Sequence, residues 1–436
     1  MDRKALVEAR ARFEAFLKPL LATVGRLERR RHGAFYVQGL LLEGKRKTAA
    51  GMAQQYGGNE QALQQFVSQS PWDWEPLRRQ LAEQMMPHLD SKAAWLLDDT
   101  GFPKEGKHSV GVARQYTGTL GKIGNCQIGV SLNYATEEGC FPLDFQLYLP
   151  ESWIQDPLRA EKAGIPVATP FRSKWQLGLE MIDQVRSWAT IPALVIVADA
   201  GYGVATEFRL QLRQRGLPYM VGVQRDLGVW TSPVEVIPVV PSRTTAQPGR
   251  PRKVQPLPLP SSALEVSLAL PESAWQTVTW REGSKGPMTS RFAALRVQPS
   301  HGHDRGQVIE FMQWLLVEWP SGMPEPFKYW LSSLPEESAL EELVYWAKIR
   351  WWIEKNYRQL KDDLGLDHFE GRSFTGWHHH MTLTMIAFDF LLLEELRQKK
   401  NYWVWVDPAQ DQAGTPSYLP AEPRLLPHLW EADWVG

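Results

Sequence analysis

A chain of 436 residues with 43% hydrophobic and 22% charged residues is typical of a globular protein with a large core and two or three domains. Its longest apolar runs, such as MIAFDFLLL at 385–393, are too short to cross a bilayer, and no apolar signal segment opens the sequence. Cys126 and Cys140 are too few for a disulfide framework, so we expect a cytoplasmic protein in which both are buried in strands.

The net charge of −1 conceals an uneven distribution of charge along the chain. Residues 1–50 carry twelve Lys or Arg against five Asp or Glu, whereas residues 401–436 carry one against five. The basic excess indicates a polyanionic partner, although such clusters are also common on plain solvated surfaces. The candidate DNA contacts in this region are Arg29, Arg30, Arg31, Lys45, Arg46 and Lys47.

Residues 5–90 have apolar residues at helical spacing and no strand-like alternation. KTAAGMAQQYGG ends in a glycine pair, and NEQALQQFVSQS follows with Asn59 as an expected helix cap. A helix, a glycine turn and a second helix after a basic cluster resemble a helix-turn-helix, although a small helical bundle gives the same pattern. We predict a helical DNA-binding domain at 1–92.

The pattern changes at residue 93, where strands begin. AAWLLDD, NCQIGVSLNYAT and CFPLDFQLYLP predict three strands in hairpin order. SKWQLGLEMIDQVRSW is a predicted helix capped by Ser173, PALVIVADAGYG contains a buried strand, and a helix near 205–215 precedes the strand LPYMVGVQ. This order predicts an α/β fold with a mixed sheet, whose first part spans 93–225.

Residues 226–335 are predicted as a β-rich insertion. A proline-rich stretch is followed by four expected strands, ALEVSLAL, TVTWRE, SRFAALRVQ and FMQWLLVEW. The core resumes at 336–398 with one long helix, ESALEELVYWAKIRWWIEKNYRQLKDDLG, and a second helix that begins at HHHM. Residues 399–436 form a proline-rich acidic tail.

The long helix places Arg350, Glu354, Tyr357 and Lys361 at steps of four, three and four, which is one helical face. Surface helices often have this pattern as well, because side-chain pairs at these spacings stabilise a helix by a small amount. Acids also follow two predicted strands, Asp98 or Asp99 after the first and Asp199 after the fourth, where ligands meet α/β sheets. Asp199 is either a helix cap or part of a site.

Three carboxylates converging from two strand ends and a helix form an oxygen cage that suits Mg²⁺. Two ions held by Asp98 or Asp99, by Asp199 and by Glu354 can activate water or a 3′-hydroxyl and stabilise the leaving oxygen. Arg350 and Lys361 on either side of Glu354 would hold phosphates, with Tyr357 on the same face.

These segments resemble bacterial insertion-sequence DDE transposases, in particular the insertion-sequence-701 branch of the insertion-sequence-4 superfamily. The resemblance covers roughly residues 30–395. It rests on LLDDTGFPKEGKHSVGVARQYTGTLGKIGNCQIGVSL, on ADAGYG, and on RWWIEKNYRQLK with LGLDHFEGRSFTGWHHH. The superfamily's mark is Tyr, two residues, Arg, three residues, Glu, six residues and Lys. Arg350, Glu354 and Lys361 match it, and the Tyr position falls on Ala347.

The resemblance implies a ribonuclease-H-like core interrupted by a β-rich insertion, in an enzyme that cuts transposon ends and joins them to target DNA. Its implied metal is Mg²⁺, for which Mn²⁺ can substitute, and its implied partners are double-stranded DNA and a second copy in the synaptic complex. It also implies a bacterial, nucleoid-associated protein. The family's Asp-x-Thr/Ser pattern fits Asp98-Asp99-Thr100 with Asp98 as the ligand, and Asp99 is the alternative because neighbouring strand residues face opposite sides.

Other residues carry weaker signals. Lys104, Lys107, Lys122 and Lys174 are candidate phosphate contacts or simply solvated lysines. Trp275, Trp280 and Trp314 could stack on a base but are better explained by core packing. The run of histidines at 378–380 lacks further ligands at zinc spacing, and GVARQYTGTLGKIG lacks a phosphate-loop Gly-Lys-Ser/Thr, so neither zinc nor a nucleotide cofactor is expected. A recruited DNA-binding protein and a nuclease without strand transfer remain the alternative functions.

Overall fold

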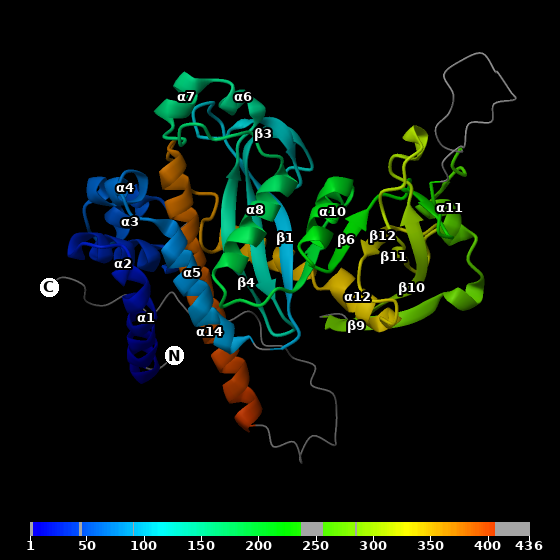
Figure 1. Ribbon diagram of the computed structural model, residues 1–436. Helices are drawn as coiled ribbons and strands as arrows, with labels where there is room; N and C mark the ends of the chain where they lie inside the picture. Colours follow the sequence, from blue (N-terminus) through cyan, green and yellow to red (C-terminus); the bar gives the residue numbers. More distant parts are fainter. Residues whose placement is uncertain (1–2, 43–45, 90, 237–255, 284–285, 406–436) are drawn as a thin grey trace, which may run out of the picture. The chain divides into compact units, whose positions relative to one another are not determined.

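The computed structural model describes residues 3–42, 46–89, 91–236, 256–283 and 286–405 (Figure 1). The chain forms two compact units: unit 1 is Met1–Ala193 with Trp351–Gly436, and unit 2 is Leu194–Arg350. These boundaries differ from the domain limits drawn from the sequence, which followed changes in composition. Lys45 and most of the predicted tail lie outside the described residues, although the last helix continues to Trp405.

Unit 1 combines a helical N-terminal part with an antiparallel sheet and two helices from the C-terminal half of the chain. Its elements are α1 (Arg3–Ala22), α2 (Leu27–Leu41), α3 (Ala49–Tyr56), α4 (Glu60–Ser68), α5 (Trp74–Met85), η1 (Met86–His88), β1 (Ala94–Pro103), β2 (Ala113–Thr117), β3 (Lys122–Ala135), β4 (Cys140–Tyr148), α6 (Glu151–Ile154), α7 (Pro157–Lys162), α8 (Lys174–Ser187), α13 (Trp351–Asp362) and α14 (Phe374–Trp405).

The sheet of unit 1 is built around β3. Strand β1 pairs antiparallel with the second half of β3 and β2 with its first half, while β4 pairs along the other edge. The three predicted strands are therefore confirmed, and β2 is an additional strand. Cys126 and Cys140 are buried free thiols in β3 and β4, as expected.

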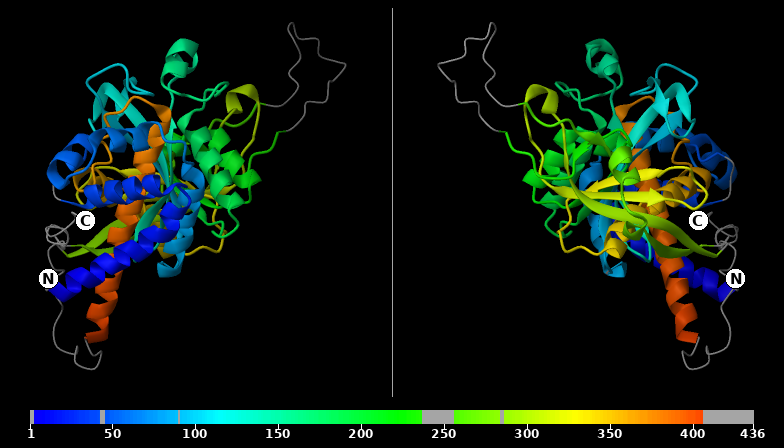
Figure 2. Two further views of the ribbon diagram at one scale, coloured as in Figure 1. Left: turned by 90° about the vertical axis from the view of Figure 1, so that its left-hand side faces the viewer. Right: turned by 90° about the vertical axis from the view of Figure 1, so that its right-hand side faces the viewer.

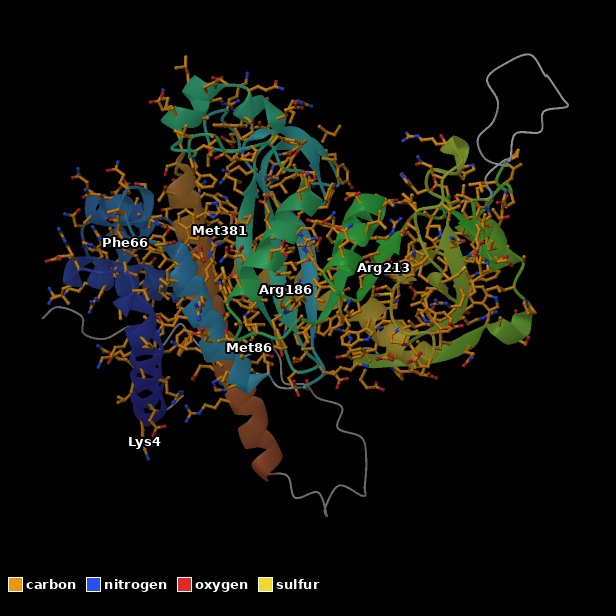
Figure 3. All side chains as sticks on the ribbon, in the orientation of Figure 1. Lys4, Phe66, Met86, Arg186, Arg213 and Met381 are labelled. Atoms are coloured by element: carbon orange, nitrogen blue, oxygen red, sulfur yellow. The ribbon has the colours of Figure 1, made fainter. Side chains whose placement is uncertain are left out.

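Helix α14 is the central helix of unit 1, on which several other elements pack. The N-terminal helices α2, α4 and α5 pack on it, as does β4, and both views in Figure 2 show these helices against the long α14. Figure 3 labels Phe66 on α4 and Met381 on α14, both of which are buried. Asn59 caps α4 as predicted, because its side chain accepts a hydrogen bond from the Ala62 amide at 3.0 Å. No helix among the described residues is both long and apolar enough to span a membrane.

Unit 2 contains a mixed sheet flanked by short helices. Its elements are β5 (Val195–Ala198), α9 (Ala200–Gly203), α10 (Thr206–Gln214), β6 (Tyr219–Val223), β7 (Gly228–Trp230), β8 (Ser261–Ser262), α11 (Ala263–Leu268), η2 (Glu272–Ala274), β9 (Gln276–Gly283), β10 (Gly286–Pro299), η3 (His303–Arg305), β11 (Gln313–Trp319), β12 (Lys328–Ser332) and α12 (Leu340–Lys348).

The strands of unit 2 join the predicted core and the predicted insertion in one sheet. Strands β5 and β6 are parallel, β6 pairs antiparallel with β12, and β12, β11, β10 and β9 continue as antiparallel neighbours. The chain therefore has a mixed α/β fold, as expected. The strands predicted at TVTWRE, SRFAALRVQ and FMQWLLVEW are confirmed as β9, β10 and β11.

Two sequence predictions are wrong. ALEVSLAL forms the helix α11 rather than a strand, because Ser262 and Glu265 make a capping box that starts a helix. The single long helix predicted at 337–365 is two helices, α12 and α13, separated by turn residues Ile349 and Arg350. The buried residues of α12 belong to unit 2 and those of α13 to unit 1, so different cores hold the two halves.

Candidate active site

Asp98 and Asp99 lie on opposite faces of β1. Asp99 accepts a hydrogen bond at 2.9 Å from the ammonium group of Lys174, which begins α8. Asp98 is 7% exposed and stands opposite Ser131 in the register of β1 and β3, so both side chains lie on the other face of the sheet. The two candidate ligands are thereby separated: Asp99 is paired with α8, and Asp98 is directed away from it.

The face that carries Asp98 is the one on which α13 packs. The Ser131 hydroxyl lies 2.6 Å from the Tyr357 hydroxyl of α13, and the Asn133 amide donates to Ser131 at 2.9 Å. Tyr357 is three residues after Glu354, so both lie on one side of the helix. The hydrogen bond therefore holds the helix that bears Glu354 against the strand pair that bears Asp98, and the geometry favours Asp98 over Asp99 as the ligand.

Buried residues hold α13 in this position. Trp352, Ile353 and Leu360 are buried, and the Asn356 amide donates to the Cys140 carbonyl at 2.9 Å. Glu354, in the first turn, lies on the exposed side. The expected buried face of this helix is present, but the helix begins at Trp351, and Arg350 precedes it in the turn.

Two lysines assigned to DNA contacts bind backbone carbonyl groups. Lys361 donates to the Gly101 carbonyl at 3.0 Å and to the Thr119 hydroxyl at 3.1 Å. Lys104 donates to the carbonyl groups of Asp367 and Phe369 at 3.2 and 2.7 Å. Burial lowers the pKa of both ammonium groups. Both lysines therefore have a structural role, and their contact with DNA stays a prediction.

Asp199 lies between β5 and α9 in unit 2. Its carboxylate accepts a hydrogen bond from the Gly201 amide at 2.9 Å, which makes it a helix cap, and the Arg350 guanidinium lies 3.7 Å from its other oxygen. The buried Arg209 donates to the Gly203 carbonyl and pairs with Glu310 at 2.5 Å. The buried Arg209 therefore holds the turn that carries Asp199. That Asp199 caps a helix does not decide whether it also takes part in a site.

The donor set suits a hard divalent cation, because Asp98 and Glu354 offer only carboxylate oxygens. Among the residues that the structure describes, no group of three or more His, Cys, Asp or Glu side chains is close enough to hold a metal ion. Asp98 and Glu354 belong to unit 1 and Asp199 to unit 2. The three-carboxylate site is therefore a proposal.

The basic N-terminal residues differ in their surroundings. Arg30 and Arg31 on α2 are exposed, and Arg29 is partly exposed. Arg46 is exposed and pairs with Glu370 at 3.3 Å, whereas Lys47 is only 6% exposed. Lys107 is exposed on the loop after β1. The exposed members of this set can reach a DNA phosphate, and the geometry gives least support to Lys47.

The three histidines and the candidate tryptophans take part in packing. His378 stacks on Trp74 at 4.6 Å between ring centroids, and His379 stacks on Trp72 at 3.5 Å. His380 lies 2.9 Å from the Tyr36 hydroxyl and 3.0 Å from the Gly365 carbonyl. In unit 2, Trp275 packs edge-on against Trp319, Trp280 lies under the Lys348 ammonium, and the Trp314 indole donates to the Pro335 carbonyl.

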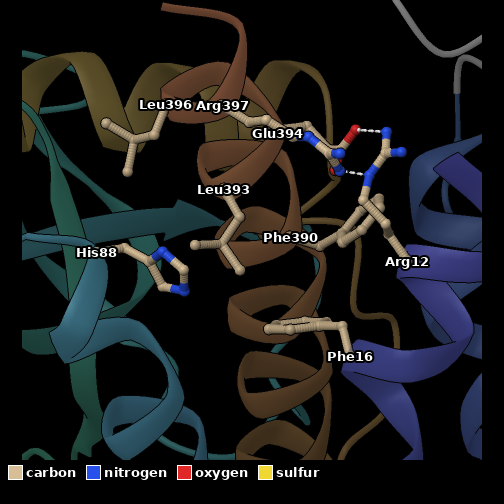
Figure 4. Close-up of a pocket in the computed structure, with 8 residues that line it drawn as sticks. All are labelled: Arg12, Phe16, His88, Phe390, Leu393, Glu394, Leu396 and Arg397. Atoms are coloured by element: carbon tan, nitrogen blue, oxygen red, sulfur yellow. Dashed lines mark hydrogen bonds and ion pairs between the residues drawn. The ribbon is translucent and has the colours of Figure 1, made fainter. Parts of the chain in front are cut away.

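A pocket of about 360 Å³ lies between α1, η1 and α14 and contains none of the predicted site residues (Figure 4). Its lining is mainly apolar, with Phe16, Phe390 and Leu393 in the wall. At its rim, Arg12 on α1 donates two hydrogen bonds to Glu394 on α14, one of them at 2.7 Å. This pocket is separate from the candidate active site.

Comparison with known proteins identifies the family. The family model for the DDE superfamily endonuclease matches residues 19–287, which is more than half of the chain. The chain belongs to the DDE superfamily endonucleases. It is also 25% identical over 334 residues to a "probable transposase for insertion sequence element IS701" from Microchaete diplosiphon, an alignment that covers 76% of this chain and 74% of that protein.

Membership of the DDE superfamily endonucleases confirms the resemblance to insertion-sequence DDE transposases and the expectation of a DDE enzyme. Members of this superfamily generally use divalent metal ions. The sequence did not predict several residues around the candidate site. These are Ser131, which stands opposite Asp98, Asn133, which donates to Ser131, and the Arg209–Glu310 pair, which holds the turn after Asp199. Their positions depend on strand register and on contacts between distant segments, for which a single sequence has no signal.

Proposed function

We propose that this DDE enzyme is a cut-and-paste transposase. It binds the terminal inverted repeats of an insertion sequence, hydrolyses phosphodiester bonds at the element's ends with Mg²⁺, and joins the freed 3′-hydroxyl groups to target DNA. Because two ends must be cut and joined together, it acts as a dimer on DNA. This proposal includes a ribonuclease-H-like core, a DNA-binding role for the N-terminal helices, and association with the nucleoid.

The observation that carries the proposal is the placement of Asp98. It occupies the face of β1 on which α13 packs. The Ser131–Tyr357 hydrogen bond holds α13 there, and Tyr357 lies one helical turn after Glu354. Asp199, the third proposed acid, directly follows strand β5 and lies 3.7 Å from the Arg350 guanidinium. The family match and the name of the relative support the same chemistry.

In the proposed mechanism the chain's own residues place the DNA and the carboxylates. Asp98, Asp199 and Glu354 would hold the divalent ions, which when bound would neutralise charge and activate an oxygen nucleophile. Arg350 contacts the phosphate next to the cleaved bond, since a guanidinium can donate two parallel hydrogen bonds to phosphate oxygens. Tyr357 holds α13 in place, and the exposed arginines of α2 contact the DNA backbone.

The test uses labelled duplex DNA that carries one end of the genetic element encoding this chain. The wild-type protein is compared with Asp199→Ala and Glu354→Ala in Mg²⁺, and binding, cleavage and joining are measured separately. We expect the wild type to cut and join, and both variants to bind DNA as well as the wild type while doing neither.

Each other outcome would assign a different function. Cleavage without a joined product would make the protein a nuclease that lacks strand transfer. Equal binding by all three proteins with no cleavage by any of them would leave a DNA-binding protein, and the enzymatic proposal would be wrong.

A further inference from the structure

The hairpin formed by β2 and β3 exposes apolar side chains. Tyr116 is 63% exposed and Ile123 is 60% exposed, and Leu120 in the connecting turn is 38% exposed. Tyr116 stands opposite Ile123 in the antiparallel register, so the two side chains lie together on one face of the ribbon. Exposed apolar groups placed side by side mark an interaction surface.

The hairpin is fixed to the strand that carries Asp98. Gly101 of β1 packs so closely on Thr117 of β2 that a Cβ atom at Gly101 would lie 1.9 Å from the Thr117 hydroxyl. The Lys361 ammonium joins the same two elements through the Gly101 carbonyl and the Thr119 hydroxyl. Gly101 is three residues from Asp98, about 10 Å along a strand. The ribbon therefore begins close to the proposed site of cleavage.

The charges of this segment fit a polyanion. Residues 106–136 contain Lys107, Arg114 and Lys122 but no aspartate or glutamate. Arg114 is exposed and lies two residues before Tyr116 on the same face, whereas the exposed Lys122 stands opposite Thr117, on the other face of the ribbon. An apolar pair with an arginine on the same face of a basic two-stranded ribbon suits nucleic acid, because ribbons fit DNA grooves and apolar side chains can enter between base pairs.

We propose that the tip of the β2–β3 hairpin binds duplex DNA beside the cleaved phosphate and that Tyr116 and Ile123 enter between neighbouring base pairs there. Arg114, on the same face, contacts a flanking phosphate. Lys361 acts as the anchor of this hairpin, which links the DNA contact to the helix of Glu354. The inference rests on the proposed function, since it assumes that DNA is the substrate of the site.

The test measures affinity for DNA duplexes that differ only in base pairing. A two-base-pair mismatch is placed at successive positions around the element end, and binding is measured by fluorescence anisotropy without a divalent metal, so that no strand is cut. Separating stacked base pairs costs free energy that a mismatch reduces, so the wild type should bind one mismatched duplex about tenfold more tightly than the paired duplex.

The double variant Tyr116→Ala with Ile123→Ala should lose this preference and bind both duplexes within about twofold of each other. The matched control is Leu158→Ala with Val167→Ala, which removes apolar groups that are 80% and 99% exposed in the same unit. The control should keep the wild-type preference. Because all four substituted side chains are exposed, both variants should fold as the wild type does, which circular dichroism would check.

Three results would overturn the inference: no mismatch preference in the wild type, an unchanged preference in the double variant, or a change only in oligomeric state, which would make the surface a contact between copies. The result is independent of cleavage. A protein that keeps the preference but never cuts DNA would contradict the proposed function alone, and one that cuts without the preference would contradict the hairpin inference alone.

Discussion

Asp98 and Asp99 are adjacent residues with different partners. The carboxylate of Asp99 is neutralised by Lys174 of α8, whereas Asp98 is buried on the opposite face, beside Ser131 and under α13. A partly exposed ion pair such as that of Asp99 contributes about 1 kcal/mol or less to stability. The two residues can therefore be distinguished by conservative substitution.

We expect Asp98→Asn to lower the rate of DNA cleavage by more than about 100-fold, since losing even an outer partner of a metal site costs 10- to 100-fold. Asp99→Asn should keep cleavage within about fivefold of the wild type. Single-turnover cleavage of the labelled element end, with DNA binding measured in parallel, checks both values. Similar losses in the two variants, or a larger loss for Asp99→Asn, would contradict the assignment of Asp98.

At the scale of single residues, the sequence predicted which side chains are candidates for the site but not which residues surround them. Strand alternation showed that only one of the two aspartates can face the site. It could not show which one, because that depends on the elements that cover each face. Lys174 was among the candidate phosphate contacts, and its pairing with Asp99 became visible only when α8 was placed.

A buried arginine of helix α5 joins this helix to β4 and α14. Arg78 is 1% exposed and donates to Asp144 of β4, to the Phe145 carbonyl at 2.8 Å, and to the Thr382 hydroxyl of α14 at 2.8 Å. Desolvation lowers the pKa of its guanidinium, and the carboxylate of Asp144 opposes that shift. A buried charge of this kind is tolerated only with its full set of partners.

Arg78→Ala should lower the free energy of unfolding by about 3–5 kcal/mol, because it leaves the Asp144 carboxylate buried and unpaired. The neighbouring Arg79→Ala is the control: Arg79 pairs with Glu83 at the surface, so its removal should cost about 0.5 kcal/mol or less. Urea unfolding followed by circular dichroism measures both. Equal effects of the two substitutions would show that the buried network does not stabilise the unit.

The two wrong predictions of elements have identifiable physical causes. In ALEVSLAL the alternation of leucine and valine suggested a strand, but the capping box of Ser262 and Glu265 favoured a helix. The break at Ile349 and Arg350 contains neither Gly nor Pro, so no local signal marks it. The helices of the N-terminal part and the strands β9 to β11 were predictable because their apolar spacing agrees with the faces that they bury.

Across the whole molecule, the core around α14 contains ionisable groups that burial keeps neutral. Burial lowers the pKa of His380 to about 4 and that of His378 well below its usual value. Burial raises the pKa of Asp389 well above its ordinary value, and its carboxyl oxygens have no hydrogen-bond partner among the described residues. On acidification, the buried histidines lower the stability of the folded state, whereas Asp389 raises it.

Lowering the pH from 7 to 5 should destabilise the protein. Below the ordinary histidine pKa of about 6.5 the unfolded chain gains protons that folded His378 and His380 do not accept, which costs on the order of 2 kcal/mol for His380 at pH 5. Asp389 acts in the opposite direction, because its folded state retains a proton that the unfolded chain loses as pH rises.

Urea unfolding at pH 5, 6 and 7 measures this dependence. The variant Asp389→Asn lacks the opposing contribution, so its stability should fall more steeply on acidification than that of the wild type. Equal slopes for the two proteins would show that Asp389 is not held protonated in the folded state.

The division of unit 1 between two distant stretches of sequence determines when the enzyme can become active during its synthesis. Strands β1 to β4 are made early, but α13 and α14, which cover them, follow Leu194–Arg350. At about 5–20 residues per second, that intervening segment takes roughly 8 to 30 s to translate. For this interval the nascent chain carries Asp98 and then Asp199 without Glu354, so the three-carboxylate site that we propose cannot form on an unfinished polypeptide.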